Sequence, residues 1–120
     1  MVVSFSPISD ATSVTLRQAL DGLQLRQDAI TANVANLETP GYLARKVEFE
    51  STLRAAIASG DPRDFAVTEQ RSLAATRLNG NNVNIDTEIL LGQETILRQR
   101  LVVQGMNSKY SILRTAISGR

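Results

Sequence analysis

Two heptad repeats, one near each end of the chain, limit what this sequence can fold into. In the first, apolar side chains recur at alternating steps of four and three residues, with Gln27 in the one slot that the series skips. Such a seam is typical of a helix that packs along another helix. The apolar slots are Leu16, Leu20, Leu23, Ile30, Val34 and Leu37. Ser9 or Asp10 can cap free backbone N–H groups, so we expect a helix over residues 10–37.

The second repeat predicts a longer helix over residues 85–118. It keeps the same alternation from Ile85 to Ile117, with Gly92 and Gln99 in two of its slots and Asp86 as the expected N-cap. The remaining slots are Ile89, Ile96, Val103, Met106, Tyr110, Leu113 and Ile117. A further apolar stripe is formed by Leu90, Leu97, Leu101 and Ile112. The apolar face is therefore wider than one neighbouring helix can cover.

These repeats predict an all-α fold in which the two terminal helices form an antiparallel, coiled-coil-like pair. We expect one domain over residues 1–120, with a turn and loop at 38–46, a short helix at 47–59 and a loop at 60–82. A short strand at 65–68 is the one alternative within that loop. Because exposed apolar surface forgoes about 25 cal/mol per Å², the isolated chain should be marginally stable and gain order on assembly. The apolar slots of both repeats are accordingly the expected assembly interface.

Composition excludes most catalytic and metal chemistry. The 120 residues include no cysteine and no histidine, and the formal net charge is +1. Without those side chains, thiol chemistry, imidazole catalysis and nearly all zinc sites are ruled out, and we expect no enzyme activity, cofactor or metal. The small net charge and the scattered basic residues of the second repeat disfavour nucleic acid as a partner. A secretory signal and an 18-residue apolar run are both missing from the sequence, so we expect no membrane insertion.

Two groups of polar residues leave alternatives open. Gln27 and Gln99 occupy seam slots, where they either fix register and partner number or lie at the edge of the packed face. The stretch Asn79-Gly-Asn-Asn-Val83 can be read as a ligand loop, but asparagine and glycine are the usual material of tight turns, which favours a turn.

The end of the first repeat is marked by unusual residues. Proline pushes the residue before it out of the helical region, and Pro40-Gly41 fits the two central positions of a type II turn. Asn33 and Asn36 lie on one helix face, where their amides can bond free carbonyls or a neighbouring subunit. Tyr42 can pack its ring while its hydroxyl stays in water. An ordinary helix stop explains the proline and glycine but leaves the other residues without a role. The expected signature turn comprises Asn33, Asn36, Thr39, Pro40, Gly41 and Tyr42.

The segment Ala32-Asn-Val-Ala-Asn-Leu-Glu-Thr-Pro-Gly-Tyr42 resembles the N-terminal signature of bacterial flagellar axial proteins, which recurs in rod and hook components after a heptad helix. The short length, Ala44-Arg-Lys-Val-Glu-Phe49 and the stretch from Asn79 to Glu88 narrow the resemblance to rod proteins of the basal body, and it covers essentially the whole chain. It implies a structural subunit of the proximal rod that assembles helically and transmits torque for motility. A soluble coiled-coil adaptor or export chaperone is the alternative.

The resemblance also implies partners and a location. The partners would be copies of the chain, other rod proteins, the membrane-ring adaptor at the rod base and the flagellar type III export apparatus. The rod crosses the periplasm, and export by that apparatus would need no cleavable signal. Phe49 and Leu53 match a short export-recognition element of such substrates, although the same spacing on a helix equally forms a packing pair.

Overall fold

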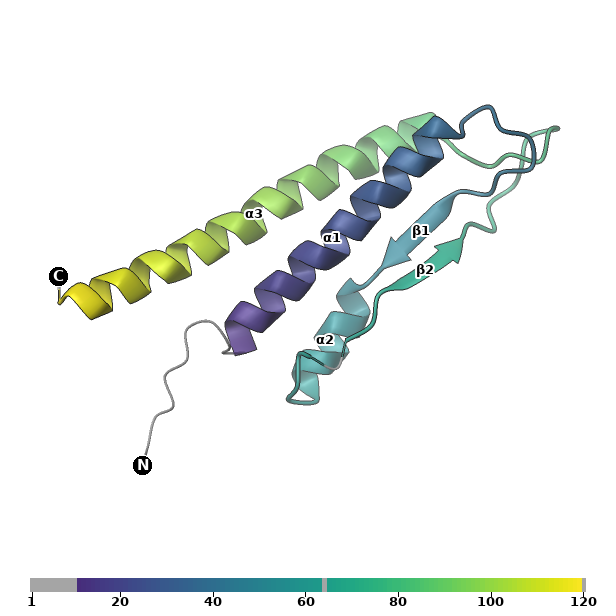
Figure 1. The fold of residues 1–120 in the computed structure, drawn as a ribbon. Coiled ribbons are helices and arrows are strands. Elements are labelled where there is room, and N and C mark those ends of the chain that lie inside the picture. Colours follow the sequence, from purple (N-terminus) through teal and green to yellow (C-terminus); the bar gives the residue numbers. More distant parts are fainter. Residues whose placement is uncertain (1–10, 64, 120) are drawn as a thin grey trace.

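Three helices and two short strands make up the described part of the chain (Figure 1). The computed structural model describes residues 11–63 and 65–119, so the expected cap at Ser9 or Asp10 lies outside the described residues. In chain order the elements are α1 (Ala11–Ala35), β1 (Arg45–Glu48), α2 (Glu50–Ala58), β2 (Thr68–Arg71) and α3 (Ile85–Ser118). The molecule is elongated and thin, with extents of 65 × 29 × 14 Å.

Helix α1 lies in the middle, with α3 along one side and β1 along the other (Figure 1). The two long helices run antiparallel, because Gly92 of α3 lies beside Ile30 and Gly105 lies beside Leu16. A Cβ atom added at either glycine would be 3.9 Å from Ile30 Cγ2 or 3.8 Å from Leu16 Cδ2, an ordinary packing distance. The expected packing of the N- and C-terminal helices is therefore confirmed.

The expectation of a purely all-α fold is wrong, because β1 and β2 form a two-stranded antiparallel sheet. Val47 pairs with Glu69 in its register. Residues 45–49 alternate in burial: Val47 and Phe49 face the core, whereas Lys46 and Glu48 are exposed. That period of two is the signature of a strand, so the short helix expected from residue 47 begins only at Glu50.

The segment 60–82 is also more ordered than a simple loop. Its strand β2 begins at Thr68 and ends at Arg71, three residues later than the alternative at 65–68 had placed one. All four β2 residues are exposed, so apolar patterning could not locate the strand. Pairing with β1 decides its position.

A small core lies between α1, β1 and α2. Its buried members are Leu23, Ala29, Val47, Phe49 and Leu53. Phe65 packs against it from the segment before β2, with its ring edge-on to that of Phe49 at a centroid distance of 6.4 Å. Gly22 has no side chain and so leaves room for the Phe49 ring. A Cβ atom added at Gly22 would lie 2.5 Å from that ring. The chain thus buries one compact apolar cluster and leaves most of α3 outside it.

Both ends of α3 are capped by residues that fit those positions. Asn84 is the N-cap, and its Oδ1 accepts hydrogen bonds from the backbone N–H groups of Asp86 and Thr87 at 3.0 and 3.3 Å. The expected cap, Asp86, instead lies in the first turn of the helix. Its negative charge there interacts favourably with the positive end of the helix dipole. Gly119 ends the helix in the left-handed region. Across the described residues, no helix combines the length and the apolar character that crossing a membrane requires.

Candidate functional site

Asn33 joins the end of α1 to the free edge of β1. Its side chain is fully buried, its Nδ2 donates to Arg45 O at 2.9 Å, and its Oδ1 accepts from Arg45 N at 2.8 Å. A neighbouring strand residue would make the same pair of bonds. The Tyr42 hydroxyl donates to the same Oδ1 at 3.2 Å. The Asn33 amide therefore covers the edge of β1 at Arg45, on the side that β2 does not pair with.

Asn36 has a different partner set, confined to the helix end. Its Nδ2 donates to Ala32 O at 2.8 Å, and its Oδ1 accepts from the Thr39 hydroxyl at 3.0 Å. The chain then turns through Pro40 and Gly41, with Tyr42 N donating to Thr39 O and Gly41 at φ 74°. These are the hydrogen bond and the positive φ of a type II turn, as predicted. Both asparagines bond within the chain, and the fully buried amide of Asn33 is not accessible to a neighbouring subunit.

A second pair of asparagines locks the segment before α3 against this turn. Asn81 is fully buried, and its Nδ2 donates to the carbonyls of Asn36 and Thr39, each at 2.9 Å. Asn82 Oδ1 accepts from Ala44 N at 2.7 Å. The asparagine-rich stretch is therefore a structural turn whose amides are used internally, and the ligand-loop alternative loses its donors.

Arg77 and Asn82 continue this hydrogen-bonding into the segment after β2. Arg77 donates to the carbonyls of Leu37 and Val83, and Asn82 Nδ2 donates to those of Ser72 and Ala74 at 3.0 and 3.2 Å. No hydrophobic pattern marks these residues, and their one signal in the sequence is the density of asparagine. The segment is held by polar contacts instead of apolar packing.

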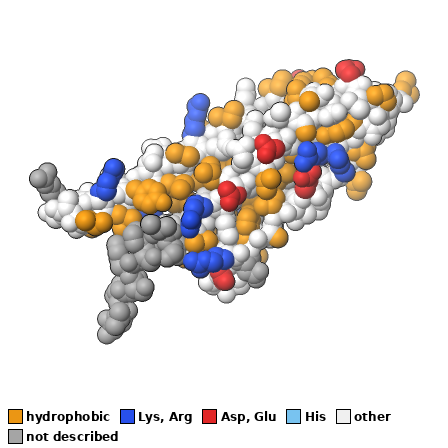
Figure 2. Space-filling model, in the orientation of Figure 1, with side chains coloured by type: hydrophobic (Ala, Val, Ile, Leu, Met, Phe, Trp, Pro, Cys, Tyr) orange, Lys and Arg blue, Asp and Glu red, His pale blue; other side chains and the backbone are white. Residues whose placement is uncertain are grey.

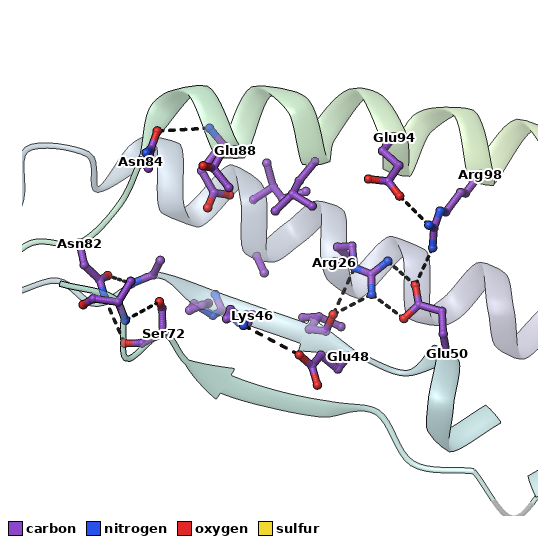
Figure 3. Close-up of a pocket in the computed structure, with 18 of the residues that line it drawn as sticks. Arg26, Lys46, Glu48, Glu50, Ser72, Asn82, Asn84, Glu88, Glu94 and Arg98 are labelled. Carbon is purple, nitrogen blue, oxygen red and sulfur yellow. Dashed lines mark hydrogen bonds and ion pairs between the residues drawn. The ribbon is translucent and has the colours of Figure 1, made fainter. Parts of the chain in front are cut away.

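An elongated cleft of about 840 Å³ runs between α3 and β1, with α1 as its floor (Figure 3). Glu88 lines it near the Asn84 end of α3. Burial raises the pKa of this carboxyl, although a hydrogen bond with Asn33 opposes the shift. Its Oε2 has no hydrogen-bond partner among the described residues. Burial therefore disfavours the ionised form of Glu88, so this carboxylate weakens the α1–α3 contact when it is charged.

At the other end of the cleft, an ion-pair network joins all three helices (Figure 3). Arg26 Nη2 of α1 donates to Glu50 Oε2 at 2.7 Å and to Val47 O at 2.9 Å, and Arg98 Nη1 of α3 donates to Glu50 Oε1 at 3.0 Å. Hydrogen bonding from Arg26 lowers the pKa of Glu50 to about 2. The guanidinium of Arg26 also lies 5.0 Å from the Phe49 ring centre. The network fixes α2 against both long helices.

The predicted seam of α3 divides into two faces. The residues turned toward α1 recur at steps of three and four, and they are polar or small at many positions. They are Ile85, Glu88, Gly92, Thr95, Gln99, Val102, Met106, Lys109 and Leu113. Every second slot of the expected seam is exposed instead, namely Ile89, Ile96, Val103, Tyr110 and Ile117. Half of the expected seam therefore lies in the α1–α3 contact, and the other half is left on the surface.

Hydrophobic side chains consequently remain on the surface of α3, interspersed with charged ones (Figure 2). Ile96 is 41 % exposed and Ile117 is 79 % exposed. The second apolar stripe is exposed as well, at Leu90, Leu97, Leu101 and Ile112. Gln99 and Gln27 are both half-buried, and the Oε1 of Gln27 is buried with no hydrogen-bond partner among the residues that the structure describes. The apolar surface that the sequence predicted to need a partner is present.

The expected interface residues of α1 are mostly used inside the chain. Leu23 and Ile30 are buried, Leu16, Leu20 and Leu37 are half-buried, and Val34 is exposed. The expected export element is inaccessible too, because Phe49 and Leu53 both belong to the buried core. Among the described residues, no group of histidine, cysteine, aspartate or glutamate side chains could hold a metal ion.

The sequence is similar to those of flagellar basal body rod proteins. The profile of the family described as "Flagella basal body rod protein" matches residues 15–42, which end with the signature turn. The chain is 33 % identical over 121 residues to the flagellar basal body rod protein FlgB of Bacillus subtilis, a match that covers 90 % of this chain and 94 % of the relative. FlgB of Cereibacter sphaeroides is 32 % identical over 118 residues, covering 85 % and 90 %. FlgB of Borreliella burgdorferi is 30 % identical over 92 residues, covering 58 % and 68 %.

Proposed function

The chain belongs to the FlgB family of flagellar basal body rod proteins, and from this premise we propose how it acts within the rod. It is a structural subunit of the basal body rod, it is not an enzyme, and it associates with other rod components. The proposal concerns which surfaces make those associations.

The exposed half of the α3 repeat supplies the assembly interface in this proposal. Ile89, Ile96, Val103, Tyr110 and Ile117 recur every seven residues on one flank of α3, and no helix in the described part of the chain covers them. Burying such a stripe contributes about 25 cal/mol per Å². That stripe is the observation that carries the proposal. Met106 and Leu113 are half-buried on the face turned toward α1, so they would contribute only their exposed parts, and Val34 of α1, which is exposed, would add to them.

The subunits would join through contacts between different surfaces, which build an open helical filament when the rotation between neighbours does not close a ring. A helical filament of these subunits would form part of the proximal rod and transmit torque. Each chain would act in it as one rigid unit. The signature turn would keep α1, β1 and the start of α3 in one rigid arrangement, so that force passes through the subunit. Its contacts would include copies of the chain, neighbouring rod proteins and the membrane-ring adaptor at the rod base.

Export is a further part of the proposal. The chain would reach a periplasmic rod through the flagellar type III apparatus without a cleavable signal. Because Phe49 and Leu53 are buried in the folded chain, this pair could be read only before folding. Folding at the assembly site would then bury the pair beside Leu23.

A pair of substitutions in a strain that lacks the chromosomal gene tests the structural role. Ile96→Asp places a charge on the exposed flank, so the isolated chain should keep its helical circular dichroism while rods and motility are lost. Leu23→Asp places a charge in the core, where Leu23 is 2 % exposed, and should lose helicity as well. Leu73→Asp, at an exposed leucine far from α3 in sequence, is the matched control and should leave cells motile. Motile cells carrying Ile96→Asp would refute the proposed interface.

A further inference from the structure

An apolar groove of about 420 Å³ opens between α2 and α3, above α1. Its floor is continuous with the core, because Leu23, Phe49 and Leu53 line it. Ile57 and Leu101 lie at its margins, and they are 47 % and 60 % exposed. The groove therefore leads from solvent directly to the most apolar part of the molecule.

The rim of the groove carries an excess of positive charge. Glu50, Arg54 and Arg98 line it. The Glu50 carboxylate is bonded to both Arg26 and Arg98, and Arg98 is also bonded to Glu94, so the positive charge that is left unbalanced is that of Arg54. Arg54 is exposed and makes no ion pair with another described residue. An occupant with an apolar side chain between two acids would match both the floor and the rim.

The chain itself carries that pattern on the opposite side of α1. Asp21, Leu25 and Asp28 follow one another at steps of four and three, so they form one stripe along the helix. Leu25 is 44 % exposed, and both aspartates are exposed. Neither aspartate pairs with a cationic side chain among the described residues.

The stripe cannot reach the groove of its own chain. Leu25 is two residues from Leu23, and at 3.6 residues per turn this separation rotates it about 200° around the helix axis. Leu23 points into the groove, so the acidic stripe points away from it. Only another molecule can bring the two surfaces together.

We propose that the Asp21–Leu25–Asp28 stripe of one copy docks into this groove on a second copy, with Leu25 over the apolar floor and the aspartates beside Arg54 and Arg98. The proposal rests on the rod function above and names one subunit contact within it. Since the groove and the stripe lie on opposite sides of α1, each copy would use both surfaces on different neighbours. Such a contact joins two different surfaces, so it can repeat from copy to copy and stack the thin molecules front to back.

Cysteine cross-linking tests the contact cleanly because the chain has no cysteine of its own. Full-length Leu25→Cys and Ile57→Cys chains are mixed and oxidised, and a heterodimer should form. It should exceed by about tenfold the product from Ile57→Cys mixed with Leu78→Cys, whose cysteine replaces a fully exposed leucine of the segment before α3. A dominant Leu25→Cys homodimer would indicate a two-fold contact and overturn the proposal. Preferential linking of Leu78→Cys would assign the groove to that leucine and overturn it too.

A charge reversal supplies a second arm that does not depend on disulfide geometry. Arg54→Glu in the Ile57→Cys chain should lower the heterodimer yield by about tenfold, and Asp21→Arg with Asp28→Arg in the Leu25→Cys chain should restore it. An unchanged yield with Arg54→Glu, or no restoration, rejects the contact. Cells that stay motile when they carry the Leu25→Cys and Ile57→Cys chains together, but give no cross-link between them in their basal bodies, reject this contact alone. Failure of the wild-type chain to restore rods would instead reject the rod function.

Discussion

Single amide side chains perform much of the structural work in this chain. Asn33 replaces a neighbouring strand at the edge of β1, and Asn81 holds the carbonyls at the end of α1. Buried polar groups cost free energy unless they are bonded, and these amides both satisfy the backbone and are satisfied by it. Asn33, Asn36 and Tyr42 do more than end a helix, because their side chains form hydrogen bonds with other residues of the chain.

Asn33→Ala should cost far more stability than Asn36→Ala. The first change leaves the buried N–H and C=O groups of Arg45 without partners, at a cost of about 2–4 kcal/mol, whereas the second removes bonds at a partly exposed helix end and costs about 1 kcal/mol. Urea unfolding followed by circular dichroism measures both. Equal losses in the two variants would show that Asn33 does not hold the strand edge.

Glu88→Gln should stabilise the isolated chain near neutral pH. Burial raises the folded-state pKa of Glu88 above its unfolded value, so the ionised carboxylate is penalised above the folded pKa and the penalty vanishes below about 4.5, where both states are protonated. Glutamine resembles the protonated acid, so the melting temperature should rise by a few degrees at pH 7 and hardly at pH 4. Glu38→Gln, at an exposed acid, is the control. A benefit that is equal at both pH values would contradict this role of burial.

Among the elements, α1 has the most demanding position because other elements pack on two of its sides. Toward β1 and α2 it presents Gly22 and Ala29, which leave room for the Phe49 ring and the strand. Toward α3 it presents larger residues such as Leu16 and Ile30, opposite the glycines of α3. A seam periodicity identifies only one of these faces, which is why Gly22 could not be recognised from the repeat.

The same substitution should have opposite effects on the two helices. Gly22→Ala puts a methyl group 2.5 Å from the Phe49 ring and should destabilise the chain by about 1–3 kcal/mol. Gly92→Ala puts its methyl group 3.9 Å from Ile30 Cγ2, an ordinary packing distance, and should stabilise the chain by about 1 kcal/mol through helix propensity. Thermal unfolding of the two variants compares them directly. A stabilised Gly22→Ala chain would show that α2 and Phe49 are not held against α1 in solution.

The whole molecule is a thin plate whose longest helix is only partly supported. At about 1.5 Å per residue, α3 is about 51 Å long, and the described α1 is about 37 Å long. The described residues beside the last turns of α3 are few, and Ile112 is 69 % exposed there. Stability should therefore vary along α3, with the lowest protection at its C-terminal end.

Hydrogen exchange should reveal this gradient. In the isolated chain, amides of residues 107–118 should exchange much faster than those of residues 88–99, which lie against α1. In purified basal bodies both segments should be protected, because neighbours cover the exposed flank. Uniform protection along α3 in the isolated chain would mean that the monomer is already complete without partners.

The sequence alone predicted the two terminal helices, their packing against each other, the type II turn at Pro40-Gly41 and an excess of apolar helical surface. Those features depend on local geometry: the period of a helix, the fixed φ of proline and the freedom of glycine at positive φ. The inward face of α3 could not be predicted, because Glu88, Thr95 and Lys109 face α1 while more apolar neighbours face outward. Neither could the sheet, since β2 has no buried residue and exists through its pairing with β1. The roles of the asparagines depend on hydrogen bonds between segments that are far apart in the chain. The single core is small, so packing in three dimensions decided which apolar residues it contains and which remain exposed.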